Sequence, residues 1–303
     1  MPGEALAEAL LAWFARNGRS ALPWRTQRDA YRVVVSEFML QQTQVERVVP
    51  IFERFVAVWP TFAALAAGSQ ADVVRAWKGL GYNSRAVRLH RLARTVGERY
   101  AGVLPAAEVE LLTLPGVGPY TARAIAAFAF DADVAAIDTN VRRIVHRTQL
   151  GIEWPPRATS ARLDALASAL VPRGRGFAFN SALMDLGATL CTARAPKCLL
   201  CPLQSSCAAA PIDAGELVRT AARNRGPSPT ARVPFERTAR FARGRVIDRL
   251  RALPAGQRIS LLALGSELDT ILPHHDRGAL SRVVADLTRD GIVQQVDDGI
   301  ALA

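Results

Sequence analysis

All four cysteines of the chain lie in one short window, at Cys191, Cys198, Cys201 and Cys207. Grouped thiols of this kind are typical of one metal centre. An iron–sulfur cluster is favoured because such clusters are held by four cysteine thiolates. Zinc also binds four thiolates, but its ligands usually come as two close pairs rather than at separations of six, two and five residues. Zinc and plain buried or bridged cysteines stay open at this point.

The first residues bear on the state of these thiols. The chain opens MPGEALAEALLAWFARNGRS, with an acidic residue before the apolar stretch and no cleavage region of the secretory type. We therefore expect a cytoplasmic protein, in which thiols stay reduced. The richest apolar run, Ala122 to Phe130, is too short to cross a membrane, so we expect a soluble protein without a membrane partner.

Length and charge narrow the class of partner. The 303 residues, half of them hydrophobic, are enough for two or three domains. The formal net charge of +11 indicates a polyanionic partner, and nucleic acid is the first expectation because basic side chains neutralise phosphates. Lys78 and Lys197 are the only lysines, so the arginine excess also reflects base composition in part.

Apolar residues recur at spacings of three and four through most of the chain, which predicts a mainly α protein. The recurrences cover 6–14, 31–58, 73–77, 89–96 and 161–170. After an arginine-rich stretch around Gly226-Pro227-Ser228-Pro229, the pattern predicts helices near 241–253, 261–268 and 277–290. Short strands at 292–296 and 300–302 then flank an Asp-Gly turn, and this order is typical of a winged helix.

A glycine-bracketed turn at 115–119 separates a short helix from an alanine-rich one. The free N–H groups of such a turn, together with the next helix N-terminus, can bind an anion such as a phosphate. An ordinary turn between two helices is the plain alternative, because glycine closes many such turns.

Six ordered blocks together resemble the helix-hairpin-helix DNA base-excision glycosylases and, among them, the adenine DNA glycosylases. The resemblance spans about residues 8 to 210. The blocks are Leu22-Pro23-Trp24-Arg25, Ser36 to Val45, Trp77-Lys78-Gly79-Leu80-Gly81-Tyr82, the hairpin Leu111 to Ile125, Ile137 to Arg143, and Asn180 to Cys207. The cysteine spacing is similar to that of the family's iron–sulfur loop, so the resemblance implies one [4Fe–4S] cluster as cofactor.

The resemblance implies a two-lobed helix-hairpin-helix glycosylase bundle with an iron–sulfur loop. We expect residues 1–27 and 136–214 to form the lobe that carries the cluster, and 28–135 to form a second bundle that contains the hairpin at 111–127. Residues 215–238 are expected to be a basic linker. Residues 239–303 are expected to be a small winged-helix-like domain.

Breaking the bond from C1′ to a purine places positive charge on the sugar and negative charge on the base, so two carboxyl groups in opposite protonation states suit the reaction. By resemblance these are Glu37 as general acid and Asp138 as the carboxylate that stabilises the sugar cation. Glu37 lies in an apolar segment, where desolvation is expected to keep it protonated. Asp138 precedes a helix, which favours its ionised form, although a plain helix cap is the alternative. Asn140 is expected to hold Asp138 or the water.

Position 120 separates two subclasses, because the related endonuclease III enzymes carry a lysine there as a Schiff-base nucleophile. This chain has Tyr120, which the resemblance places against the target adenine and the aspartate. We therefore expect hydrolysis without efficient strand cleavage.

The remaining expected site residues contact DNA. By resemblance Gln42 and Tyr82 enter the base stack with Gln41 and Thr43 beside them, which helps to offset the cost of extruding the target nucleotide. The N–H groups of Gly116, Val117 and Gly118 are expected to bind phosphates. Arg25 is expected near DNA or as a partner of the pocket, with a surface ion pair as its alternative. The cluster loop is expected to present Arg194 and Lys197 to phosphates.

The expected substrate is double-stranded DNA that contains adenine opposite 8-oxoguanine or guanine, bound by a monomer in the cytoplasm at the nucleoid. Two differences from the family bear on the opposite base. We do not expect residues 236–303 to form the usual C-terminal domain that recognises 8-oxoguanine, because they are too few and too helical, and Asn83 stands where a second tyrosine is common. The alternatives are a thymine/uracil mismatch glycosylase and a non-catalytic iron–sulfur DNA-binding module. An intact set of Glu37, Tyr120 and Asp138 argues against the module.

Overall fold

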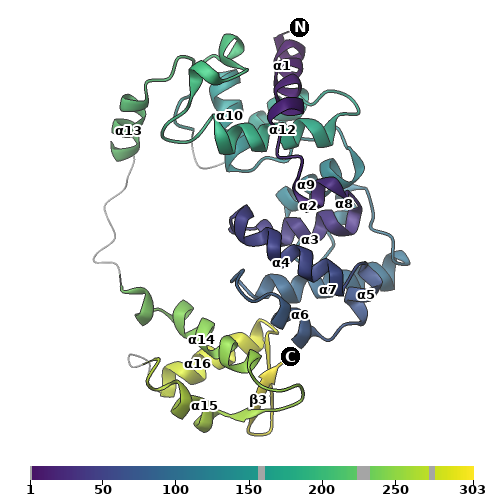
Figure 1. Cartoon of the computed structure of the whole chain (residues 1–303), viewed down its shortest axis with the longest axis vertical. Helices are drawn as coiled ribbons and strands as arrows, with labels where there is room; N and C mark the ends of the chain where they lie inside the picture. The colour runs from purple at the N-terminus through teal and green to yellow at the C-terminus, as the bar shows by residue number, and fades with distance from the viewer. Residues whose placement is uncertain (1, 156–160, 224–232, 273–276) are drawn as a thin grey trace. The chain divides into compact units, whose positions relative to one another are not determined.

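The computed structural model describes residues 2–155, 161–223, 233–272 and 277–303 (Figure 1). The chain falls into two compact units. One comprises Met1–Glu37 and Pro105–Ser228, and the other comprises Phe38–Leu104 and Pro229–Ala303. Gly226 to Pro229, the predicted centre of the linker, lies outside the described residues.

The first unit is helical and is built around α12. This helix packs against α1, α9 and α10 because its apolar residues, Phe179 and Leu186 among them, are fully buried. Its elements are α1 (Pro2–Asn17), α2 (Pro23–Thr26), the start of α3 (Ala30–Leu40), α8 (Glu108–Leu111), α9 (Pro119–Phe130), α10 (Thr139–Leu150), α11 (Ala161–Ala169), α12 (Gly176–Thr189), the 3₁₀ turns η1 (Cys198–Leu200) and η2 (Gln204–Ser206), and α13 (Ala214–Arg223).

The second unit begins with a small helical bundle in which α7 packs against α5 and α6. Trp77 and Phe55 are buried in its core and meet edge to face, with ring centroids 6.1 Å apart. The bundle consists of the end of α3, α4 (Val45–Val58), α5 (Phe62–Ala67), α6 (Gln70–Ala76) and α7 (Ser84–Tyr100). The apolar recurrence over 31–58 is therefore two helices, separated by a loop in which Gln42 has a positive φ of 55°.

The C-terminal part of the second unit has the predicted order of helices and strands. It contains η3 (Phe235–Arg237), α14 (Ala239–Arg251), α15 (Leu261–Leu268), α16 (Arg277–Arg289), β2 (Val293–Val296) and β3 (Gly299–Leu302). Strands β2 and β3 pair antiparallel across the predicted Asp-Gly turn, with Val296 opposite Gly299. The sequence did not reveal β1 (Ile259–Ser260), a two-residue strand that pairs with β3 and completes a sheet of order β1-β3-β2.

The two units divide the chain differently from the predicted lobes. The hairpin at 111–127 groups with the segments around the cysteines, because α9 packs against α12. Residues 239–303 group with the helices of 38–104. The predicted domain boundaries stay a prediction. Among the described residues, no helix is both long enough and apolar enough to cross a membrane.

Candidate active site

Three side chains predicted to take part in the chemistry come together in the first unit, each from a different element. Glu37 lies on α3, Tyr120 in the first turn of α9, and Asp138 at the N-cap of α10. The Tyr120 hydroxyl donates a hydrogen bond to the Glu37 carboxyl, and Asp138 lies close enough to influence Glu37 electrostatically. A small apolar cluster packs against Tyr120, formed by Val33, Ala124, Phe128 and Ala136.

Glu37 is almost fully buried, with 8% of its surface exposed. Burial, and to a smaller extent the nearby charge of Asp138, raise the pKa of Glu37 to about 7. The hydrogen bond from Tyr120 and the charge of Arg25 act in the opposite direction. Close to neutral pH a substantial fraction of Glu37 is therefore protonated and able to donate a proton. The predicted rise in its pKa agrees with the structure.

Asp138 is the N-cap of α10. The helix cap that the sequence offered as an alternative is therefore present, and the same residue also lies in the site. Its Oδ1 accepts hydrogen bonds from the backbone N–H groups of Asn140 and Val141, at 2.8 and 2.7 Å. Desolvation raises the pKa of Asp138, and its hydrogen bonds only partly oppose that rise. The hydrogen bonds of the cap favour the ionised form, as the sequence indicates, but burial outweighs them and the pKa of Asp138 is raised overall.

Asn140 connects Asp138 to the end of α12. Its Nδ2 donates to Oδ2 of Asp138 at 3.0 Å, and its Oδ1 accepts from Arg143 at 2.8 Å. Arg143 also donates to the carbonyls of Gly187 and Cys191, at 2.8 and 2.7 Å. A Cβ at Gly187 would lie 2.6 Å from the Asn140 side chain, so glycine is what permits this close approach. Asn140 therefore holds Asp138, as one of the two predicted roles states.

Arg25 lies in a buried ion pair. Its guanidinium donates to both carboxylate oxygens of Asp185, at 2.7 and 3.2 Å, and Arg19 donates to the same carboxylate at 2.7 Å. Although burial alone would raise the pKa of Asp185, the two arginines lower it overall. Because its guanidinium is occupied, we withdraw the expected DNA contact for Arg25. Its effect on the pKa of Glu37 fits the alternative role as a partner of the pocket.

The residues expected to enter the base stack lie in the second unit. Gln42 is exposed and Tyr82 is 44% exposed, and both have a positive φ, 55° and 44°, which is uncommon for residues other than glycine. Such a backbone costs on the order of 1–3 kcal/mol and persists where surrounding contacts enforce it.

Arg85 supplies those contacts, and sequence reasoning missed it. This residue is 4% exposed, and its guanidinium lies 5.7 Å from the Tyr82 ring centroid. It donates hydrogen bonds to both loops, namely to the carbonyls of Phe38, Met39, Gln41, Leu80 and Gly81 and to the hydroxyl of Thr43. The carbonyl of Gln41 and the hydroxyl of Thr43 are thereby already engaged within the protein.

The hairpin turn only partly matches its prediction. Gly116 has a positive φ of 80° and Gly118 caps α9 in an extended conformation, as a turn before a helix N-terminus requires. The N–H of Val117, however, donates to the Leu114 carbonyl at 3.2 Å, and the Val117 side chain is buried. Val117 is therefore corrected from a phosphate ligand to a packing residue, whereas the Gly116 and Gly118 N–H groups donate to no other described residue.

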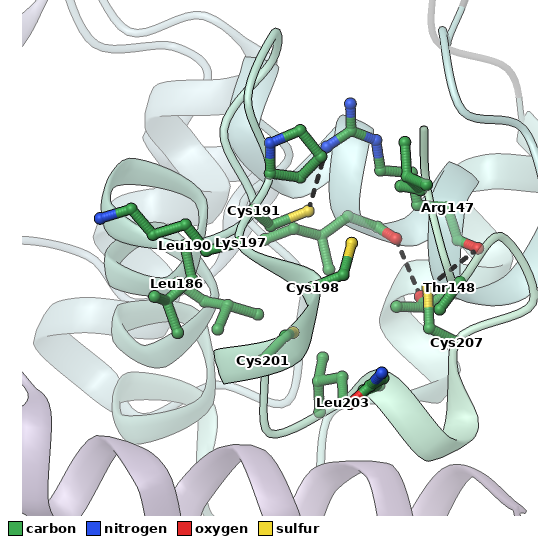
Figure 2. A pocket seen from close by; sticks show the side chains of 15 residues that line it. Arg147, Thr148, Leu186, Leu190, Cys191, Lys197, Cys198, Cys201, Leu203 and Cys207 are labelled. Atoms are coloured by element: carbon green, nitrogen blue, oxygen red, sulfur yellow. Dashed lines mark hydrogen bonds between the residues drawn. The ribbon is translucent and has the colours of Figure 1, made fainter. Parts of the chain in front are cut away.

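The four cysteines line one pocket in the first unit (Figure 2). All four are free thiols, which rules out the disulfide alternative in this structure. Among the described residues, no three metal-binding side chains converge closely enough for a single ion. Four thiols spread around one hollow suit a larger cluster with one thiolate on each iron better than a zinc ion.

Arg147 anchors the loop that carries these cysteines, and it too was missed from the sequence. It is fully buried and donates to Cys191 Sγ at 3.3 Å (Figure 2). It also donates to the Thr192 carbonyl at 2.8 Å. Arg194 and Lys197 lie in the same loop and are exposed, as predicted.

The chain matches two family models. Residues 35–168 match the HhH-GPD superfamily of base excision DNA repair proteins, and residues 191–207 match the iron–sulfur binding domain of endonuclease III. An adenine DNA glycosylase of Mycolicibacterium smegmatis is 42% identical, over 96% of this chain and 93% of the relative. The chain belongs to the adenine DNA glycosylase family. A relative of the same name from Mycobacterium tuberculosis is 41% identical over 96% of this chain and 90% of its own length.

Among solved structures, a thermostable thymine-DNA glycosylase is similar, with a TM-score of 0.63 and 31% identity over 69% of this chain and 96% of that protein. The comparisons confirm the predicted helix-hairpin-helix fold, the family, the enzyme class in base excision repair and the four-cysteine iron–sulfur domain. The adenine DNA glycosylase relatives match more of the chain, at higher identity, than the thymine-DNA glycosylase does, so they favour the leading reading over the mismatch alternative.

Proposed function

We propose that the chain hydrolyses the N-glycosidic bond of adenine opposite 8-oxoguanine or guanine in double-stranded DNA. The observation that carries this proposal is a pair of carboxyl groups, the buried Glu37 and the half-buried Asp138, which lie with Tyr120 in one unit. The pKa of Glu37 is raised to about 7, so one member of the pair can donate a proton while the other remains ionised. We further propose that the protein acts as a monomer in the cytoplasm.

In the proposed reaction, Glu37 gives its proton to N7 of the extruded adenine. The bond from C1′ to the base then breaks, and its electron pair leaves with the protonated adenine. The sugar is left as an oxocarbenium ion, which the Asp138 carboxylate stabilises. A water molecule adds at C1′ and returns its proton to Glu37, which restores the acid. General acid catalysis of this kind contributes about 10²- to 10⁴-fold in rate.

The hydrogen bonds of Asp138 indicate which oxygen serves the sugar. Oδ1 accepts two backbone N–H groups, so both of its lone pairs are occupied. Oδ2 accepts only the Asn140 side chain among the hydrogen bonds of the described residues, so it has capacity left. We assign Oδ2 to the sugar cation, with Asn140 as the residue that orients it.

The remaining predicted site residues serve DNA. Gln42 and Tyr82 enter the base stack, with Gln41 and Thr43 beside them, and the Gly116 and Gly118 N–H groups bind phosphate. Cys191, Cys198, Cys201 and Cys207 would hold the cluster, and its binding would fold the loop so that Arg194 and Lys197 face phosphates. Tyr120 in place of a lysine leaves the hairpin without an amine nucleophile.

The test is single-turnover base release from duplexes that contain A:8-oxoG, A:G, A:C, T:G or U:G, with Glu37→Gln and Asp138→Asn beside the parent. We expect adenine release from A:8-oxoG and A:G, its loss in both variants, and no covalent trapping by borohydride. Thymine or uracil release that survives Glu37→Gln would instead support the mismatch alternative, and release of no base by the parent would support the binding-module alternative.

A further inference from the structure

The C-terminal part of the second unit contacts α6 and the loop that leads to Tyr82. Arg251 of α14 donates through Nε and Nη2 to the Val74 carbonyl, at 3.1 and 2.9 Å. Val74 lies in the last turn of α6, where carbonyls lack a partner within the helix. At the other end of α6, the Gln70 side chain donates to the Gly291 carbonyl at 2.8 Å. These contacts hold the C-terminal part at both ends of α6.

Arg251 also reaches the residue at which this chain departs from the family pattern. Its Nη2 donates to Oδ1 of Asn83 at 2.6 Å. Asn83 stands where a second tyrosine is common, directly after Tyr82. The short Asn83 side chain therefore accepts a hydrogen bond from Arg251 of the C-terminal part. The Arg251 side chain is only 9% exposed.

Arg240, in the first turn of α14, lies on Tyr82 itself. Its guanidinium is 4.7 Å from the ring centroid, closer than that of Arg85 on the same ring. The five arginines of α14 are not alike, because four of them form ion pairs: Arg243 with Asp290, Arg245 and Arg251 with Asp248, and Arg249 with Glu267. Arg240 forms none with a described residue and is exposed, so the Tyr82 ring is its main contact.

We propose that α14 is a positioning element for Tyr82, through which the C-terminal part of the chain sets the preference for the opposite base. Arg251 fixes the backbone beside Tyr82 through Val74 and Asn83, and Arg240 holds the ring in the orientation in which it enters the base stack. The proposal rests on the proposed function, in which Tyr82 is a stacking residue. Arg240 and Arg251 act through Tyr82 and are not catalytic residues.

The experiment uses the full chain and two readouts. Unstacking is followed by the fluorescence of 2-aminopurine placed beside the target adenine, and base release is followed under single turnover on A:8-oxoG and A:G. We expect Arg240→Ala to slow unstacking roughly 2- to 5-fold, the factor that an exposed cation–π contact is worth. The ratio of the two release rates should fall toward one. Arg251→Met should act in the same direction.

The controls separate positioning from stability. Arg240→Lys keeps a cation above the ring and should restore most of the unstacking rate, whereas Arg243→Ala, on the same helix but paired with Asp290, should behave like the parent. A variant that merely unfolds more easily lowers the active fraction and leaves the rate constants and their ratio unchanged. Parent-like unstacking and release ratios in both Arg240→Ala and Arg251→Met would overturn the proposal. A parent that releases no adenine would overturn the proposed function, while unstacking would still test Arg240.

Discussion

At the scale of single residues, burial and hydrogen bonds have opposite effects on the pKa of the two carboxyl groups in the site. Glu37 and Asp138 are both removed from water, which raises the pKa of each. The cap of α10 and Asn140 give Asp138 three hydrogen bonds that favour its charged form, whereas Glu37 receives one from Tyr120. This difference supports the proposed roles of Glu37 as the acid and Asp138 as the anion.

The pH dependence of the chemical step should follow Glu37 on its alkaline side. A general acid acts in its protonated form, so the single-turnover rate should fall as the pH rises through about 7. On the acidic side the rate should fall where Asp138 becomes protonated. Rates measured across pH on an A:8-oxoG duplex test this, and Glu37→Gln should remove the alkaline fall together with most of the rate. If the rate of the Glu37→Gln variant still falls as the pH rises, a group other than Glu37 causes that fall.

Two substitutions at Asp138 should separate its structural and chemical roles. Asn caps helices about as well as Asp, whereas Ala loses about 1 kcal/mol of cap stability. We therefore expect Asp138→Asn to melt close to the parent and to release no base. Asp138→Ala should be equally inactive and should also melt at a lower temperature. Thermal unfolding and single-turnover assays on the two variants measure both effects, and measurable base release by Asp138→Asn would exclude the carboxylate from the chemistry.

At the scale of elements, buried arginines hold the functional loops. Arg85 binds the two loops that carry Gln42 and Tyr82, and Arg147 binds the cysteine loop. Each donates mainly to backbone carbonyls, so it fixes the path of a loop whatever side chains the loop carries. Loops with few internal hydrogen bonds are thereby held by the helices beside them.

Replacing Arg85 should destabilise the second unit strongly. Arg85→Met leaves several buried carbonyls without a donor, and each such group costs about 1–3 kcal/mol. We expect a loss of about 3 kcal/mol or more in the free energy of unfolding, measured by urea denaturation. Arg94→Met on the same helix is the matched control, since its ion pair with Glu98 is exposed and should contribute less than about 1 kcal/mol. Equal effects of the two substitutions would contradict the assigned role of Arg85.

At the scale of the whole molecule, the net charge of +11 is distributed unevenly. The sequence of α14 is strongly basic by itself, but two of its arginines are neutralised by acids from outside the helix, Glu267 and Asp290. The exposed Arg194 and Lys197 of the cysteine loop form no ion pair with a described residue. DNA affinity should therefore depend on a few unpaired cations rather than on the total charge.

That view predicts a measurable dependence on salt. Each phosphate contact contributes about 0.9 to the slope of log affinity against log salt concentration. Arg194→Ala should therefore reduce the slope by about one contact, whereas Arg289→Ala, whose ion pair with Asp286 lies on α16, should leave it unchanged. Fluorescence anisotropy titrations of labelled duplex at several salt concentrations give the slopes. An unchanged slope for Arg194→Ala would remove the cysteine loop from the DNA contact.

The sequence was most informative where motifs are local. The cysteines and the winged-helix pattern could be placed because their spacing is visible along the chain, whereas Glu37 and Asp138 were placed by the resemblance to the family. Four buried charged residues could not be predicted, because a charged residue in a helical pattern normally faces solvent. They are Arg85, Arg143, Arg147 and Asp185. Their burial depends on partners far away in the sequence, such as Asp185 with Arg19, 166 positions apart.

The double duty of Asp138 bears on how the protein can fail in a cell. Exchanging one carboxylate oxygen for an amide removes the charge that the sugar requires but keeps the acceptor that α10 requires. The product is a well-folded protein that still reaches its lesion and cannot process it. In a cell that also carries an intact copy, such a protein would occupy the proposed substrate and keep the intact enzyme from it, so this single substitution should act dominantly, whereas loss of one copy should not.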